Sequence, residues 1–311
     1  KRSSITESLV FDKSGNFVTD TEENGDSLLR RKLTGYVSYV RGENPYTFPF
    51  RIYPDIFSPE NQLDQENYPK IQMNKKNIDE PIQNIPLYVT KMGEYQSKGY
   101  NCIMDYLHNR GGDITDKFGQ TKTMPSFENM ETFGYTYLEK PLQSLDIVYP
   151  SPELDAIIQN TELNETNLET VVQNMVGKNG LARIMKHDTS DILNYNYEYK
   201  EDSLNKYGRI FNQENLHKYS NKMSNICSKI MNSTGIIIVY SQYIDGGVVP
   251  MALALEELGF SRYGSANYTK SLFKNKPTEY IDAITLKPKS QGIEFHPAKY
   301  VMITGDKRFS P

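Results

Sequence analysis

The strongest fold signal in the chain lies in Gly235–Phe260, which reads GIIIVYSQYIDGGVVPMALALEELGF. The apolar run Ile236–Tyr240 predicts a buried strand, and the polar turn Ser241–Asp245 follows it at once. A Gly-Gly pair then opens an apolar stretch that predicts a helix over Gly247–Leu258. Strand, turn and helix in this order are half of a parallel βαβ unit, in which ligands bind where strands end and helices begin. We therefore look for the chemistry of the protein at this turn.

The length, net charge and cysteine content of the chain limit the class of protein to which it can belong. Its 311 residues can bury a large core and hold two domains, or one domain with a large insertion. A formal net charge of −4 gives no overall attraction to nucleic acid, so a polyanion site has to be a local basic patch. Cys102 and Cys227 lie in apolar helical patterns, which favours buried thiols in a reducing, intracellular compartment. No apolar run reaches about 18 residues, so we expect no membrane span, and the start at Lys1 predicts a piece of a longer polypeptide.

The last third of the chain alternates between helix and strand. A helix is predicted over Leu216–Met231, followed by the strand Ile236–Tyr240, the helix Gly247–Leu258 and a strand over Tyr300–Thr304. This alternation predicts a parallel, three-layer α/β domain.

The first two thirds are less regular. Strands are predicted over Gly35–Val40 and Pro86–Thr90, and a helix over Gly93–His108. Residues 109–215 show no regular alternation of elements, which is typical of an insertion into an α/β core. Within them the sequence predicts a strand over Ser144–Tyr149, helices over Leu163–Met175 and Asn179–Met185, and a loop over Asn194–Asn205.

Common catalytic motifs are absent from the sequence. It contains no GxxxxGK[ST] phosphate-binding loop, no GxGxxG, no HExxH and no GxSxG. The four histidines are scattered singly, which favours surface or packing roles over metal ligation. A self-sufficient hydrolase or metalloenzyme is therefore not expected.

Two strand ends remain as candidate sites. At the first, Ser241 and Gln242 precede a helix whose backbone N–H groups could help them to hold a phosphate. The alternative is an ordinary strand-to-helix turn, with Asp245 as the helix cap. At the second, Gly305 allows close approach of the backbone, and Lys307 and Arg308 could neutralise phosphates. The alternative there is a solvated surface turn. In a parallel sheet both ends lie at one edge, which favours a joint role.

Five blocks of sequence together resemble a known family. They are LLRRKLTGYVSYVRGENPYTFPFRIYP (Leu28–Pro54), IPLYVTKMGEYQSKGYNCIM (Ile85–Met104), SLDIVYP (Ser144–Pro150) with GKNGLARIM (Gly177–Met185), YSNKMSNICSKIMNSTGIIIVYSQYIDGGVVPMALALEELGF (Tyr219–Phe260) and YVMITGD (Tyr300–Asp306). The chain resembles the second RecA-like lobe of superfamily 2 helicases. It is most similar to the Swi/Snf-related helicase-like ATPases of large nucleocytoplasmic DNA viruses, a group that includes poxvirus early transcription factor and nucleoside triphosphate phosphohydrolase.

The resemblance implies an ATP-driven motor that binds nucleic acid, DNA or RNA, across two lobes, with ATP and Mg²⁺ held between the lobes of the full-length protein. It implies a RecA-like parallel sheet with flanking helices, incomplete at the C-terminus, with a largely helical insertion. The polar residues 1–30 predict an arm or loop. The segments that the resemblance implies after it are the start of the lobe over 31–108, the insertion over 109–215 and the lobe core over 216–311. No residue is expected to be catalytic or to bind metal, and the residues expected to contact the nucleic-acid backbone are Ser241, Gln242, Thr304, Gly305, Asp306 and, by charge alone, Lys307 and Arg308.

Departures from the family pattern limit what this chain is expected to do alone. The Walker and acidic motifs of the first lobe are absent, and the arginine-finger strand and helix would follow Pro311. We therefore expect the chain alone neither to bind ATP tightly nor to unwind nucleic acid. The resemblance implies the first lobe, and viral RNA polymerase or transcription factors, as partners in the virion or the host cytoplasm. The alternative function is a non-enzymatic helicase-like scaffold that docks other transcription or virion proteins.

Overall fold

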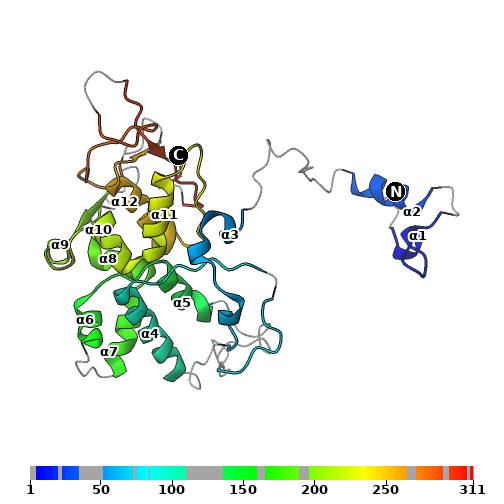
Figure 1. The fold of residues 1–311 in the computed structure, drawn as a ribbon, viewed down its shortest axis with the longest axis horizontal. Helices are drawn as coiled ribbons and strands as arrows, with labels where there is room; N and C mark the ends of the chain where they lie inside the picture. The colour runs from blue at the N-terminus through cyan, green and yellow to red at the C-terminus, as the bar shows by residue number, and fades with distance from the viewer. Residues whose placement is uncertain are drawn as a thin grey trace. The chain divides into compact units, whose positions relative to one another are not determined.

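The computed structural model describes residues 5–19, 23–34, 52–72, 75–83, 85–109, 136–159, 165–188, 196–264, 271–289, 294–306 and 309–310. The chain divides into two compact units, Lys1–Phe57 and Ser58–Pro311, which we describe separately (Figure 1). The predicted boundaries at residues 30, 108 and 215 stay predictions.

The N-terminal unit is built from three short helices, α1 (Glu7–Val10), α2 (Gly25–Leu33) and α3 (Pro54–Phe57). The chain between α1 and α2 folds back, because the N–H of Val18 donates to the carbonyl of Val10 and the N–H of Gly25 to that of Val18. A side chain at Gly25 would not fit, since its Cβ would lie 2.1 Å from the Val10 carbonyl oxygen. The segment predicted as a polar arm therefore contains α1 and the first part of α2.

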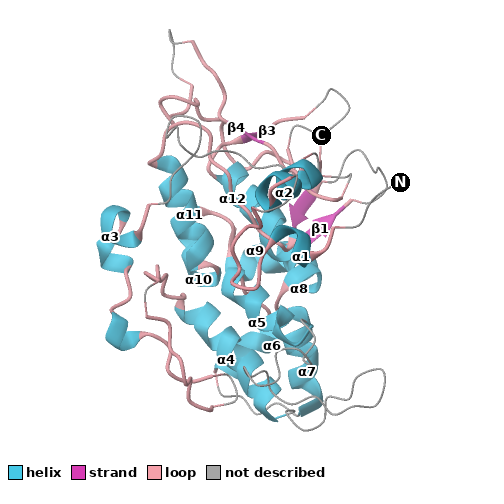
Figure 2. Ribbon diagram, turned by 90° about the vertical axis from the view of Figure 1, so that its right-hand side faces the viewer, coloured by secondary structure: helices cyan, strands magenta, loops and turns pink. Residues whose placement is uncertain are grey.

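Most of the regular secondary structure among the described residues of the larger unit is helical (Figure 2). Polar side chains cap several of them. The Ser151 hydroxyl accepts from the N–H of Leu154, and the Asn212 amide oxygen accepts from the N–H of Glu214. The helices are η1 (Pro59–Asn61), η2 (Gln65–Asn67), α4 (Glu94–Asn109), α5 (Thr136–Asp146), α6 (Pro152–Ile158), α7 (Glu165–Asn174), α8 (Gly177–Ile184), α9 (Glu201–Tyr207), α10 (Gln213–Tyr219), α11 (Asn221–Met231), the π-helical turn η4 (Ile244–Val248) and α12 (Val249–Glu257).

The described residues form two small sheets. In the first, β1 (Met185–His187) pairs antiparallel with β2 (Tyr197–Tyr199). In the second, β3 (Ser261–Arg262) pairs parallel with β4 (Lys299–Tyr300), beside α12. The predicted α/β class is thus confirmed in its coarse form.

Two hydrophobic clusters fill the larger unit. One surrounds α12 and draws on residues from Ile147 to Phe309, including Leu216, Cys227 and Leu253. The other lies between α4, α6 and α7 and contains Ile103, Leu154, Val172 and Met175. Apolar burial at both clusters supplies the main free energy that favours folding.

The structure confirms the helices predicted near α4, α7 and α8, and it corrects several other elements. The single helix predicted over Leu216–Met231 is two helices, because the Ser220 hydroxyl donates to the carbonyl of Asp146 and accepts from the N–H of Met223, which starts α11. The loop predicted over Asn194–Asn205 is wrong, since it contains β2 and most of α9.

Several of the predicted strands are not confirmed. Ser144–Tyr149 is not a strand: α5 runs to Asp146, and Val148 and Tyr149 donate to the carbonyls of Tyr219 and Met175 rather than to a strand. In Pro86–Thr90 the pairing is one isolated bridge, between Tyr88 and Gln62. The strand predicted over Gly35–Val40 lies outside the described residues.

The strand predicted over Ile236–Tyr240 is likewise absent. The reason is that none of these residues makes a backbone hydrogen bond to another described residue. The strand predicted over Tyr300–Thr304 is reduced to β4, which ends at Tyr300.

We expect Gly93→Ala to destabilise the protein by about 1–3 kcal/mol, because the new Cβ would lie 2.4 Å from the carbonyl oxygen of His217 in α10. Gly305→Ala is the matched control. Its Cβ would meet no atom within 4 Å, so its effect should stay within about 0.5 kcal/mol. Urea unfolding followed by circular dichroism measures both. Equal midpoints for the two variants would contradict the close contact between Gly93 and α10.

Candidate functional site

The turn after Ile236–Tyr240 is held in place by short contacts. The Ser241 hydroxyl accepts from the N–H of Tyr243 at 3.2 Å. It also lies so close to Gly247 that a Cβ there would come within 2.0 Å of the Ser241 oxygen. The Tyr149 hydroxyl donates to the carbonyl of Asp245 at 2.9 Å, which ties η4 to the buried core. Ser241 therefore positions the turn, while the Gln242 side chain next to it is exposed.

The second predicted strand end forms a closed turn. The Thr304 hydroxyl donates to the carbonyl of Asp306 at 3.0 Å and accepts from the N–H of Asp306 at 3.1 Å. The Ser310 hydroxyl accepts from the N–H of Thr304 and donates to its carbonyl, at 2.8 and 2.7 Å. These bonds leave Gly305 exposed at the tip, with open space around its Cα. Lys307 and Arg308 lie outside the described residues.

One groove lies between the turn of Ser241 and the segment that leads into the second predicted strand end. Its volume is about 370 Å³, and it runs between two segments, Ile236–Ser241 and Lys299–Met302. Its floor is the side of α12 that carries Met251, Ala252 and Leu255. Ser241 lines the groove itself, whereas Thr304 follows Met302 and does not. We call this feature the central groove.

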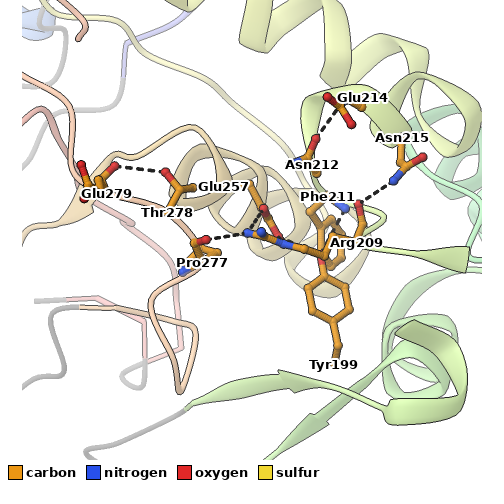
Figure 3. A network of polar contacts seen from close by, with 10 residues as sticks. All are labelled: Tyr199, Arg209, Phe211, Asn212, Glu214, Asn215, Glu257, Pro277, Thr278 and Glu279. Carbon is orange, nitrogen blue, oxygen red and sulfur yellow. Dashed lines mark hydrogen bonds and ion pairs between the residues drawn. The ribbon is translucent and has the colours of Figure 1, made fainter. Parts of the chain in front are cut away.

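The groove floor is anchored by two buried carboxylates that the sequence analysis did not select. Glu257 accepts from the guanidinium of Arg209 through both of its oxygens and from the Tyr199 hydroxyl at 3.1 Å (Figure 3). The same guanidinium donates to the carbonyl of Pro277 at 2.9 Å. Burial raises the pKa of Glu257, against the lowering effect of Arg209.

Glu256 ties a second loop and β4 to the same helix. Its carboxylate accepts from the Ser271 hydroxyl at 2.6 Å, from the N–H groups of Leu272 and Phe273 at 2.7 and 3.1 Å, and from the Tyr300 hydroxyl at 2.7 Å. Burial raises its pKa too, despite these four hydrogen bonds. Two adjacent acids inside an otherwise apolar helix were the signal that could have identified this anchor.

Among the described residues, no group of three or more His, Cys, Asp or Glu side chains could hold a metal ion. The sequence contains no phosphate-binding loop of the GxxxxGK[ST] type. In the part of the chain that the structure describes, no helix is both long enough and apolar enough to cross a membrane.

Comparison of the chain with protein-family models, with curated proteins and with solved structures found no match. The resemblance to helicase second lobes therefore stays a prediction, and the site has to be judged on its own geometry.

The pH dependence of stability tests the anchor at Glu257. Because its folded-state pKa lies above its usual 4.5, its contribution to stability is complete below about pH 4.5 and is lost as the pH rises through the folded-state value. Each unit of upward shift costs about 1.4 kcal/mol at neutral pH. We expect Glu257→Gln to reduce the decline in stability between pH 4.5 and 7, measured by urea unfolding.

Glu201→Gln, at an exposed position in α9, is the matched control for loss of one glutamate. The readout is the slope of stability against pH, so any constant loss from weaker contacts to Arg209 does not affect it. The same slope in Glu257→Gln as in the wild type would show that Glu257 does not titrate differently on folding.

Proposed function

We propose that this chain is part of the second lobe of an ATP-dependent nucleic-acid helicase or translocase of viral, transcription-related type, and that it contacts the phosphate backbone of DNA or RNA. The single observation that carries the proposal is the central groove, which has the turn of Ser241 on one side and, on the other, Lys299–Met302, the segment that leads into the second predicted strand end. The parallel pairing of β3 with β4 beside α12 supports a RecA-like sheet as the finer fold.

The geometry divides the predicted contacts into two roles. Ser241, Thr304 and Asp306 are engaged within their own turns, so we assign them to positioning. The N–H of Gly305 at the exposed turn tip is suited to a phosphate oxygen, and Gln242 lies next to Ser241 at the other turn. Lys307 and Arg308 follow in sequence and add positive charge.

ATP and Mg²⁺ belong, in this proposal, to the first lobe of the full-length protein, which supplies the phosphate-binding loop. The proposed partners are nucleic acid, that first lobe, and viral RNA polymerase or transcription factors. This chain by itself is proposed to be inactive as an ATP hydrolase.

A scaffold role is the second candidate, and one observation favours it. Ile236, Ile238, Tyr240 and Ile303 are large apolar side chains with most of their surface exposed. Exposed apolar side chains that gather along one segment are typical of surfaces that dock other proteins.

Fluorescence anisotropy of labelled single- and double-stranded oligonucleotides tests the nucleic-acid proposal on the full 311-residue chain. We expect binding that weakens between about 50 and 200 mM salt, because each phosphate contact releases counterions. The slope of log affinity against log salt concentration should be about −0.7 to −0.9 for each phosphate contact. Lys307→Ala combined with Arg308→Ala should lower the affinity. It should also make the slope of log affinity against log salt concentration shallower, by the amount expected for about two lost phosphate contacts.

The adjacent pair Lys75→Ala with Lys76→Ala is the matched control, since it removes the same charge from a different loop. Absence of salt-dependent binding in the wild type would leave the scaffold as the better reading. An equal loss in both double variants would mean that net charge, and not this turn, holds the nucleic acid.

A further inference from the structure

Each side of the central groove contains a run of residues that has no backbone pairing within the part of the chain that the structure describes. Neither Ile236–Tyr240 nor Val301–Ile303 makes a backbone hydrogen bond to another described residue. Along the first run the exposed fraction alternates between 98, 42, 90, 42 and 86%. A period of two is typical of a strand, with Ile237 and Val239 turned toward the groove. The second run also alternates, from Val301 at 47% to Met302 at 2% and Ile303 at 84%.

The groove between these edges is apolar at its floor and charged at one position. Its floor and walls carry aliphatic side chains, among them Ile237, Val239 and Leu255. Lys299 is the one charged side chain among the described lining residues, and it forms no ion pair with another described residue. A small apolar ligand could fill the floor, but it could not pair with the two rows of N–H and C=O groups. An extended polypeptide can do both.

We propose that the central groove accepts one extended segment of a partner protein, which adds as a β-strand between Ile236–Tyr240 and Val301–Ile303. The segment has β-branched apolar side chains at alternate positions, directed at α12, and a carboxylate at the end that meets Lys299. Main-chain hydrogen bonds supply affinity in this mode of binding, and the pockets for alternate side chains supply specificity. The inference is independent of the proposed contacts to nucleic acid, which lie at the turns beyond the groove.

The probe is a fluorescein-labelled peptide, Glu-Val-Thr-Ile-Thr-Val-Glu, added to the full 311-residue chain and followed by anisotropy. It places three apolar side chains on one face and a carboxylate at either end. We expect saturable binding. The same peptide with N-methyl groups on alternate residues keeps every side chain but loses the backbone N–H donors of those residues. Its affinity should therefore fall at least tenfold. Equal binding of the two peptides, or no saturation with either, would overturn the proposal.

Two neighbouring isoleucines give a matched pair of variants. Ile237 lines the groove and Ile238 does not, although they differ by one position in the same run. Ile237→Thr and Ile238→Thr make the same chemical change and keep a β-branched side chain. We expect about a tenfold loss of peptide affinity in the first and less than a twofold change in the second. Equal losses would contradict insertion between these edges.

Lys299→Met keeps the result interpretable if Ile237→Thr folds poorly, because Lys299 is exposed. This variant should weaken the Glu-ended peptide about threefold and leave a Gln-ended peptide unchanged. An equal loss of affinity for the Glu-ended and Gln-ended peptides would contradict a contact between Lys299 and the carboxylate of the segment. Sedimentation velocity on the wild type tests a second copy of the chain as the occupant. A dimer that the peptide dissociates and that Ile237→Thr weakens would assign the groove to a second copy and overturn the proposal.

Discussion

Helix α12 is buried along its whole length, from Val249 to Glu257, and every one of its faces therefore needs a neighbouring element. α10 and α11 cover part of it, and β3 with the loop at Leu272 covers another part. Its two acids would be costly in this position without donors, since a buried carboxylate loses its hydration. Arg209 and the N–H groups after Ser271 supply those donors, so the same helix that forms the core also fixes the surrounding loops.

This burial also sets the shape of the site. η4 continues directly into α12, and Tyr149 and Ser241 hold its start at the entrance of the central groove. Tyr300 reaches Glu256 and thereby keeps β4 next to the helix. The central groove lies over the side of α12 that carries Met251, Ala252 and Leu255.

Local patterns in the sequence predicted the helices better than the strands. The periodicity of Gly93–His108 was enough to predict α4, because a helix satisfies its own backbone. Ile236–Tyr240 has the composition of a strand, but a strand needs a partner, and the partner is not encoded in the run itself. The break between α10 and α11 was missed for a related reason, since Ser220 acts through the carbonyl of Asp146, far away in sequence.

The candidate site, like the fold, was predictable only in its local features. That Ser241 follows an apolar run and precedes a helix is visible in the sequence, and the structure places it at a groove with Lys299–Met302. The closed turn at Thr304 was not visible, because it depends on Ser310. Glu256 and Glu257 were not predicted as an anchor, since a sequence does not show which donors will surround a carboxylate.

The pairing of β3 with β4 has a consequence for the order of folding. Ser261 and Lys299 pair only after the long chain between them has closed into a loop, and such closure costs entropy before the contacts repay it. α11 contacts α12 across a shorter separation in sequence and is expected to pack against it first. One side of the central groove therefore takes shape late. The apolar run at Ile236 faces solvent both before and after that step, as an edge open to association with other chains.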